Sequence, residues 1–369
     1  MEFIDLNKQY LRIKPKIDLA INKVLQNQNF ILGEEVTEFE RIMNDYLNTF
    51  SVGVANGTDA LMIALMAAGI NEGDEVITPS FTWVSTVEVI KLLKARPVFV
   101  DIDPNTFNID EKLIEERITP KTKFIIPVSL FGCCPNLDKI MEIANHHNLL
   151  VLEDAAQSYG AKSNGKLSCS IAHISTTSFF PAKPLGCYGD GGAIFSSDKD
   201  LLERSKIISR HGQSGRYNYV TVGVNSRLDT IQAAVLIEKH KILEDEIERR
   251  NKVASTYNDL LGENDYFKLP KVNNESNRSV WAQYTIQLNA ELKPHRQKIM
   301  DSLKISNIPT ALYYPAPLHL QGPYLDNSIE LPHTVNISDS VLSLPMHPYL
   351  SLEEIQEICH HLSMVVEGL

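Results

Sequence analysis

The stretch FSVGVANGTDALMIALMAAG, residues 50–69, indicates the fold class of this 369-residue chain. It begins with the apolar run SVGVA, turns at NGT and continues as DALMIALMAAG. In that last part Leu61, Leu65 and Ala68 share one helical face, and Gly69 is a residue that commonly ends helices. The stretch therefore predicts a strand, a tight turn and a helix, which together begin a β-α-β unit.

The segments that follow repeat this alternation of strand and helix. Strands are predicted in GDEVITPS, RPVFVDID, KFIIPVSLF and LLVLEDAAQS, and helices in VEVIKLLKA and NLDKIMEIANHHN. Pro127 lies inside KFIIPVSLF, where it would remove one donor from a strand ladder. Because short strands alternate with helices, we expect an α/β fold with a largely parallel sheet. Ligands of such sheets bind at the carboxyl ends of the strands.

The two ends of the chain differ from this central region. Residues 13–50 have a helical pattern with one apolar face. The alternation fades near residue 240, where EKHKILEDEIERRNKVASTYNDLL predicts a long charged helix. A chain of 369 residues is long enough for two domains. We therefore expect a large domain at 1–240 and a smaller one at 241–369.

The composition argues against several classes of partner. The chain carries 35 Lys and Arg against 46 Asp and Glu, a formal net charge of −11. Nucleic acids and anionic membranes bind basic surfaces, so we expect neither as a partner. The opening MEFIDLNKQYLRIK lacks the apolar core of a signal peptide, and no apolar run approaches the roughly 20 residues that span a bilayer.

Cysteine and histidine usage leads to two further expectations. The five cysteines are odd in number and form no CxxC pair, which is typical of reduced thiols and predicts a cytoplasmic protein. The histidines occur as adjacent pairs, His146-His147 and His360-His361. Adjacent residues do not share the helical face that residues at i and i+4 share, so we expect no metal site.

Four motifs carry residues that could perform chemistry. In ANGTDAL, a strand turns into a helix whose free backbone N–H groups could bind an anion. Asp154 ends a buried strand in VLEDAAQS, where a carboxylate is costly unless a cation faces it. Trp83 follows a strand end and could stack on a flat ligand. Lys183, in SFFPAKPLGCYGDGGA at 178–193, lies between two prolines and just before a run of glycines.

Each of these motifs also has an ordinary explanation: a routine helix cap, an N-cap aspartate, a core tryptophan and a surface loop lysine. Together, however, they match the needs of pyridoxal phosphate (PLP). That cofactor requires an anion-binding site for its phosphate and an aromatic or apolar side chain against its ring. It also requires a carboxylate at its pyridine nitrogen and a lysine that bonds to its aldehyde. The chain has neither GxxxxGK[ST] nor GxGxxG, so it lacks the fingerprints of nucleoside triphosphate and dinucleotide sites.

A fifth motif, GVNSRLDTIQAAVL, contains Asn225 and Arg227. In an extended segment these two side chains would point in the same direction. Asn225 could donate to a phosphate, and Arg227 could grip a carboxylate or a phosphate with two hydrogen bonds. The ordinary alternative is an exposed loop before a helix.

The order of these motifs resembles the sugar aminotransferases of the DegT/DnrJ/EryC1/StrS family. The resemblance runs from FIDLNKQY and ILGEEVTEFE near the start to SLPMHPYL near the end. Its most specific part is VLEDAAQSYGA followed by TTSFFPAKPLGCYGDGGA. It implies the aspartate-aminotransferase fold (PLP fold type I), with a large domain built on a mixed, mainly parallel sheet and a smaller C-terminal α/β domain.

The resemblance also implies an activity. It predicts transfer of an amino group from glutamate, through PLP, to the ketone of a nucleotide-linked sugar. The favoured substrate is UDP-2-acetamido-2-deoxy-ribo-hexuluronate, aminated at its 3-keto position, with a product used for a surface polysaccharide such as the O-antigen of lipopolysaccharide. Two alternatives stay open: a 3-keto or 4-keto 6-deoxy nucleotide sugar as substrate, or a regulator that binds PLP without turnover.

Residue roles around the cofactor ring follow from the same resemblance. Lys183 would bond to the aldehyde and move the proton during catalysis. Asp154 would keep the pyridine nitrogen protonated, and Gln157 would lie near the ring's 3-hydroxyl. Trp83 would stack on the ring.

The resemblance also assigns residues that would bind the phosphate of the cofactor and the substrate. Gly57, Thr58 and Ser178 would hold the phosphate of the cofactor. Asn225 would reach that phosphate from the neighbouring subunit, and Arg227 would cross the same interface to the sugar carboxylate. The resemblance therefore implies a homodimer with shared active sites.

The substrate side of the predicted site includes two tyrosines. Tyr313 and Tyr314 would contact the nucleotide sugar. From the resemblance we would expect serine more often where this chain has Ala182, and histidine where it has Tyr313. Both departures concern residues near the substrate, so the identity of the sugar is open while the chemistry of the cofactor is unchanged.

Overall fold

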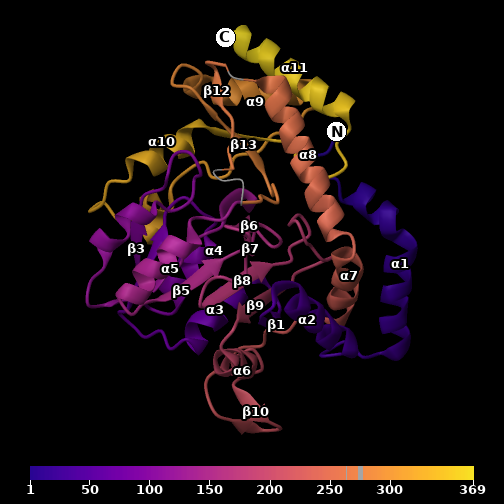
Figure 1. The fold of residues 1–369 in the computed structure, drawn as a ribbon, viewed down its shortest axis with the longest axis vertical. Coiled ribbons are helices and arrows are strands. Elements are labelled where there is room, and N and C mark those ends of the chain that lie inside the picture. The colour runs from indigo at the N-terminus through magenta and orange to yellow at the C-terminus, as the bar shows by residue number, and fades with distance from the viewer. Residues whose placement is uncertain (263, 273–276) are drawn as a thin grey trace.

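The computed structural model describes residues 1–262, 264–272 and 277–369. At its centre lies a seven-stranded sheet in the order β1-β9-β8-β5-β4-β2-β3 (Figure 1). The strands are β1 (Phe50–Val54), β2 (Glu75–Pro79), β3 (Arg96–Val100), β4 (Thr122–Ile125), β5 (Leu150–Asp154), β8 (Ile174–Ser178) and β9 (Gly192–Ser196). Neighbouring strands from β8 to β3 are parallel, and β9 runs antiparallel to β8 and to β1. This confirms the predicted mixed, mainly parallel sheet.

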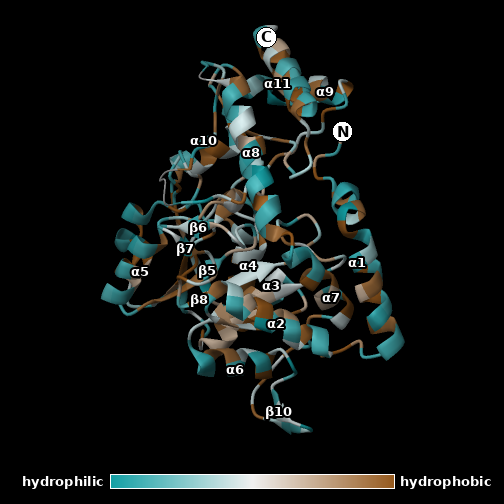
Figure 2. Cartoon of the chain, turned by 45° about the vertical axis from the view of Figure 1, so that its right-hand side comes forward, coloured by the Kyte–Doolittle hydropathy of each residue, from teal (hydrophilic) through white to brown (hydrophobic). Residues whose placement is uncertain are grey.

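Helices cover both faces of this sheet and pack through apolar stripes. Helices α3 and α6 share one buried cluster with the strands, and α2 and α7 contribute to a second cluster. Figure 2 shows apolar and polar residues alternating around α1, α2 and α11, as expected for helices with one buried face. The helices of this part are α1 (Leu6–Asn27), α2 (Glu34–Leu47), α3 (Gly57–Ala67), α4 (Ser85–Leu92), α5 (Leu137–His146), α6 (Lys199–Ile208) and α7 (Thr230–His240).

Three boundaries differ from the sequence-based expectation. The helical region predicted at 13–50 is two helices, because the chain turns at Gln28 and Leu32, which adopt positive φ angles. The long charged helix predicted near residue 240 is also divided, between α7 and α8 (Leu243–Leu261). Strand β4 ends at Ile125, before Pro127, which has no N–H to donate to a ladder.

The last part of the chain has a core of its own. Strands β12 (Phe267–Lys268), β13 (Tyr284–Leu288) and β14 (Val341–Leu344) form an antiparallel sheet. Helices α8, α9 (Arg296–Ile305) and α11 (Leu352–Glu367) share its buried cluster, in which the rings of Tyr257 and Tyr284 stack. Helix α10 (Pro332–Ser340) precedes β14 directly. The predicted domain boundary near residue 240 stays a prediction.

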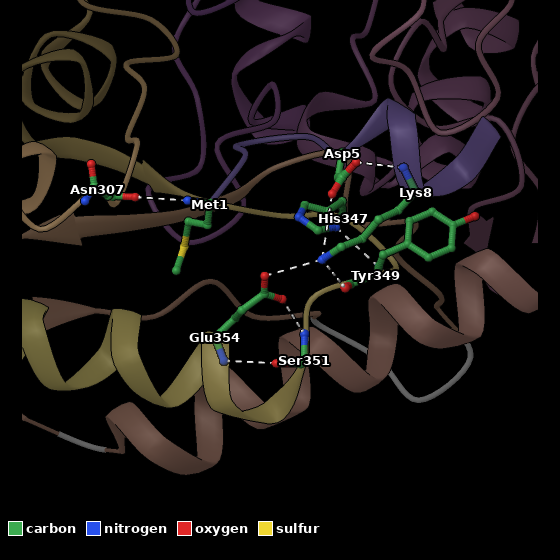
Figure 3. A network of polar contacts seen from close by, with 8 residues as sticks. All are labelled: Met1, Asp5, Lys8, Asn307, His347, Tyr349, Ser351 and Glu354. Atoms are coloured by element: carbon green, nitrogen blue, oxygen red, sulfur yellow. Dashed lines mark hydrogen bonds and ion pairs between the residues drawn. The ribbon is translucent and has the colours of Figure 1, made fainter. Parts of the chain in front are cut away.

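The first residues of the chain lie against this C-terminal part (Figure 3). The backbone N–H of Met346 donates to the carbonyl of Phe3 at 3.1 Å. Lys8 Nζ lies 3.3 Å from a carboxylate oxygen of Glu354 and 3.4 Å from the carbonyl oxygen of Tyr349. The chain therefore begins beside the small sheet and enters the large sheet only after α1 and α2.

Two short hairpins lie outside these two sheets. They are formed by β6 (Lys162–Ser163) with β7 (Lys166–Leu167) and by β10 (Gln213–Gly215) with β11 (Asn218–Tyr219). No described helix is long and apolar enough to cross a membrane. Within the same described ranges, no group of three or more His, Cys, Asp or Glu side chains is arranged to hold a metal ion.

Candidate active site

A cavity of about 390 Å³ opens at the carboxyl ends of β2, β5 and β8. This is the position at which sheets of this kind bind ligands. Most of the residues singled out from the sequence line it: Gly57, Thr58, Trp83, Asp154, Gln157, Ser178, Lys183, Tyr313 and Tyr314. Asn225 and Arg227 do not.

Asp154 and Lys183 form the charged pair of the cavity. Asp154 is buried at the end of β5, and its carboxylate accepts from the Thr86 hydroxyl at 2.8 Å and the Ala156 N–H at 3.2 Å. Burial raises the pKa of Asp154, and those two donors, with the charge of Lys183, oppose the rise. Burial lowers the pKa of Lys183, and the charge of Asp154 acts against it. A carboxylate so placed can balance a cationic ligand, and an amine so placed loses its proton more easily.

The loop from β8 to β9 explains why prolines and glycines surround Lys183. The Lys183 N–H donates to the Phe180 carbonyl at 2.9 Å, and the Cys187 N–H donates to the Phe179 carbonyl at 2.8 Å. The loop folds back so closely that a Cβ on Gly186 would lie 2.5 Å from the Pro181 carbonyl oxygen. Only glycine fits at that position, and the compact coil directs Lys183 into the cavity.

The N-terminus of α3 forms another part of the cavity wall. The Asn56 side chain caps this helix by accepting from the Asp59 N–H at 2.8 Å. The first N–H groups of a helix have no partner within it, which leaves those of Gly57 and Thr58 available to an anion. A Cβ on Gly57 would lie 2.7 Å from Ser178 Cβ, so the absence of a side chain allows the helix to approach the end of β8.

Aromatic and amide side chains line the remainder of the cavity. Trp83 is 58% exposed, and its ring centroid lies 6.3 Å from that of Tyr314. Gln157 Nε2 donates to the Tyr314 hydroxyl at 3.1 Å, and its Oε1 accepts from the Phe131 N–H at 2.7 Å. Gln157 and Tyr314 are thus fixed relative to each other on one side of the cavity.

These residues fit pyridoxal phosphate. The helix N-terminus beside Gly57 can accept a phosphate, and the buried carboxylate of Asp154 can face a protonated ring nitrogen. Lys183 supplies an amine in the same cavity, and Trp83 supplies a flat surface.

Two supporting residues were not found by reading the sequence. Thr86 holds the Asp154 carboxylate, although it lies in the same TPSFTWVST motif as Trp83. Glu153, beside Asp154 in β5, is fully buried and accepts from hydroxyls of Ser129 and Ser168, each at 2.7 Å. Because side chains alternate along a strand, Glu153 lies on the face opposite to Asp154 and anchors the strand from behind. Their partners come from distant segments, so spacing along the sequence gives no signal for them.

The position of Asn225 and Arg227 follows from the residue between them. Ser226 is buried, and its hydroxyl accepts from the Ala55 N–H at 3.0 Å, just beyond the end of β1. Since side chains alternate in an extended segment, the neighbours of Ser226 face away from the chain's own sheet. Asn225 is exposed and Arg227 is half-buried. Their predicted roles stay predictions.

The family profile of the DegT/DnrJ/EryC1/StrS aminotransferases matches residues 12–363. The chain belongs to this family. Its aminotransferases depend on pyridoxal phosphate, and the fold is PLP fold type I, so the predicted family, fold class and cofactor are confirmed. The chain is accordingly a PLP-dependent aminotransferase.

Three similar proteins illustrate this membership. UDP-2-acetamido-2-deoxy-3-oxo-D-glucuronate aminotransferase of Pseudomonas aeruginosa is 50% identical over 97% of this chain and 98% of its own length. A solved family member from Brucella abortus is 42% identical and aligns with a TM-score of 0.92 over 100% of this chain and 99% of its own. NtdA of Bacillus subtilis, solved with bound cofactor PMP, is 33% identical with a TM-score of 0.91, covering 99% of this chain and 83% of its own.

Proposed function

We propose that this protein transfers the amino group of glutamate to the 3-keto position of UDP-2-acetamido-2-deoxy-3-oxo-D-glucuronate, the 3-keto uronate favoured by the sequence. The observation that carries this proposal is the 50% identity, over nearly the full length of both chains, to an aminotransferase named for that substrate. The amino sugar then enters the synthesis of a surface polysaccharide, with lipopolysaccharide O-antigen as the expected class.

Lys183 and Asp154 carry the central roles in this proposal. PLP supplies an electron-withdrawing ring that stabilises negative charge on the carbon atom that loses or gains a proton. Lys183 would hold the aldehyde carbon of the cofactor through Nζ until the amino group of glutamate takes its place, and the freed amine would carry the proton from the α-carbon of glutamate to that carbon of the cofactor. Burial lowers the pKa of Lys183, which favours the neutral amine needed for this transfer. Asp154, fixed by Thr86 and Ala156, faces the ring nitrogen and keeps it protonated.

The other cavity residues bind and orient. Gly57, Thr58 and Ser178 hold the phosphate at the start of α3, where the helix dipole favours an anion. Trp83 covers one face of the ring, and Gln157 lies at the ring's 3-hydroxyl. Tyr313 and Tyr314, which line the cavity, contact the nucleotide sugar.

We also propose that the active form is a homodimer whose subunits share their sites. Asn225 and Arg227 face away from their own sheet, which suits residues that act in the partner's cavity. Asn225 would donate to the phosphate, and Arg227 would bind the C6 carboxylate of the sugar with paired hydrogen bonds. The proposed domain division near residue 240 places both residues in the large domain.

A cytoplasmic location is proposed from the cysteines. All five are free thiols, and four of them are buried. Burial raises the pKa of Cys133 and of Cys187 to about 11, so neither is a reactive thiolate at neutral pH. Reduced, unreactive cysteines suit a reducing compartment.

Substrate choice can be tested with Arg227→Ala. Removing the guanidinium should lower kcat/KM for the 3-keto uronate by roughly 100-fold, because a charge-assisted pair of hydrogen bonds to the carboxylate is lost. Turnover of a UDP-linked 6-deoxy keto sugar, which has no carboxylate, should change by less than roughly threefold. The measurement is product formation by mass spectrometry with glutamate and a panel of UDP- and dTDP-linked keto sugars.

The same panel decides between the proposed substrate and its alternative. Equal losses on both sugars after Arg227→Ala, or a wild-type preference for a 6-deoxy keto sugar, would favour the 6-deoxy alternative. A regulator without turnover would leave the absorbance of the bound cofactor unchanged after glutamate is added. Membership of an aminotransferase family argues against that last outcome.

A further inference from the structure

The base of the loop that carries Lys183 is held by a side chain outside the cavity. Tyr188 lies five residues after Lys183, and its backbone N–H donates to Gln232 Oε1 at 2.8 Å. Gln232 Nε2 in turn donates to the Tyr188 carbonyl at 3.4 Å. One amide side chain from α7 therefore pairs with both backbone groups of a loop residue, as a neighbouring strand would.

The neighbouring residue shows how closely this amide approaches the loop. A Cβ on Gly189 would lie 2.9 Å from Gln232 Nε2. Any side chain there would push the amide away from Tyr188. Gly189 has an ordinary φ angle, so close approach, and not backbone strain, is the structural reason for glycine at this position.

A second contact from the same helix acts on the side chain of Tyr188. Lys239 lies seven residues after Gln232, and therefore on the same face of α7. Its Nζ lies 4.2 Å from the centroid of the Tyr188 ring, a cation–π distance. The ring of Tyr10 in α1 meets the Tyr188 ring edge to face at 6.3 Å, and Figure 1 shows α1 and α7 side by side.

The loop between Lys183 and Tyr188 is compact enough to transmit this restraint. Cys187 donates to the Phe179 carbonyl both through its N–H at 2.8 Å and through Sγ at 3.0 Å. Gly186 packs against the Pro181 carbonyl, as described above. A shift at Tyr188 would therefore displace the whole coil, including Lys183.

We infer that Gln232 is a positioning residue for Lys183: its side-chain amide fixes Tyr188 and thereby fixes the loop that presents the lysine to the cofactor. Gln232 and Tyr188 do not line the cavity, so Gln232 acts through the loop and not on substrate. The inference rests on the aminotransferase activity and not on which sugar is aminated.

The test compares wild-type protein with Gln232→Leu, which keeps the approximate size of the side chain and removes both hydrogen bonds. The rate constant for reaction with glutamate, followed by the absorbance of the bound cofactor in a single turnover, should fall about tenfold, because a misplaced reacting group loses its alignment. The dissociation constant of PLP should stay within roughly twofold, since its phosphate is held elsewhere. In the apoprotein, amide hydrogen exchange of the peptide containing Tyr188 should accelerate about tenfold.

Matched variants separate positioning from general damage. Gln297→Leu, an exposed glutamine in α9, should leave all three measurements at wild-type values. Gln232→Glu retains an acceptor for the Tyr188 N–H and should recover part of the rate. Unchanged reactivity with glutamate in Gln232→Leu overturns the inference, even if exchange accelerates.

The inference stays testable if Gln232→Leu does not fold or if wild-type protein does not react with glutamate. If Gln232→Leu does not fold, Gly189→Ala, whose Cβ displaces the same amide, replaces it: slower reaction supports the inference and an unchanged rate overturns it. If wild-type protein does not react with glutamate, the proposed amino donor is wrong. The comparison of variants is then made with whichever amino acid changes the cofactor absorbance.

Discussion

Lys239 is a buried cation whose charge has a cost for the folded protein. It is 2% exposed, and its Nζ has no hydrogen-bond partner within the described part of the chain. Burial lowers its pKa from 10.5 to about 8, although the charge of Glu246 opposes the fall. A shift of this size corresponds to about 3 kcal/mol of lost stability when the lysine is charged, as an upper bound. The cation–π contact with Tyr188 offsets about 1 kcal/mol of this lost stability.

Because the buried charge of Lys239 destabilises the folded protein, replacing this lysine with an apolar residue should stabilise it. The folded pKa lies below the unfolded one, so between pH 8 and 10.5 the unfolded chain binds more protons and stability rises with pH. Lys239→Met should therefore raise the free energy of unfolding by about 1–2 kcal/mol at pH 7. The advantage should shrink as pH rises from 8 to 10.5 and the wild-type lysine loses its charge.

The measurement is urea unfolding of both proteins at pH 7 and pH 9.5. Lys241→Met, an exposed lysine at the end of the same helix, serves as the control and should show no such pH-dependent difference. A variant less stable than wild type at pH 7 would contradict the expectation. A stabilised Lys239→Met that also reacts more slowly would show that the buried charge is kept for function.

At the scale of single elements, the start of α3 shows how backbone geometry shapes the proposed phosphate site. Gly57→Ala would place a methyl group 2.7 Å from Ser178 Cβ and force the helix away from β8. We expect the dissociation constant of PLP to rise about tenfold or more, because the N–H groups would no longer converge on the phosphate. Titration of apoprotein with PLP, followed by absorbance, measures this change.

The control for this prediction is Gly368→Ala, near the end of the chain, whose added Cβ would lie no closer than 3.4 Å to a described atom. It should leave PLP affinity unchanged. Wild-type affinity in Gly57→Ala would show that the phosphate is held elsewhere.

The elements also show what a single sequence can and cannot predict. The strand-turn-helix at residues 50–69 was predicted because its periodicity changes at NGT, and β1 and α3 lie on either side of that turn. Asp154 was found because it ends a predicted strand, and Lys183 because prolines flank it and a run of glycines follows. The positive φ angles at Gln28 and Leu32 that separate α1 from α2 have no comparable signal. Thr86 was missed as a partner of Asp154 because only the fold brings them together.

At the scale of the whole molecule, the first residues connect the small sheet to the active site. Ile4 lines the cavity, and the ring of Phe3 lies 6.3 Å from that of Tyr313. The bond from Met346 to Phe3, together with the contacts of Lys8 in Figure 3, holds this segment against the C-terminal part. Neither the path of this segment nor its contact with the cavity could be predicted from helical periodicity, because both depend on packing between the two ends of the chain.

This arrangement makes Ile4 part of the wall of the cavity in which the nucleotide sugar is proposed to bind. A larger side chain there should obstruct the sugar more than the smaller glutamate. We therefore expect Ile4→Trp to raise KM for the keto sugar about tenfold, while the single-turnover rate with glutamate stays within roughly twofold of wild type. Leu11→Trp, a 58% exposed leucine in α1, is the matched control and should change neither value. Equal effects on glutamate and on the sugar would mean that Ile4 supports the cavity as a whole and does not select the substrate.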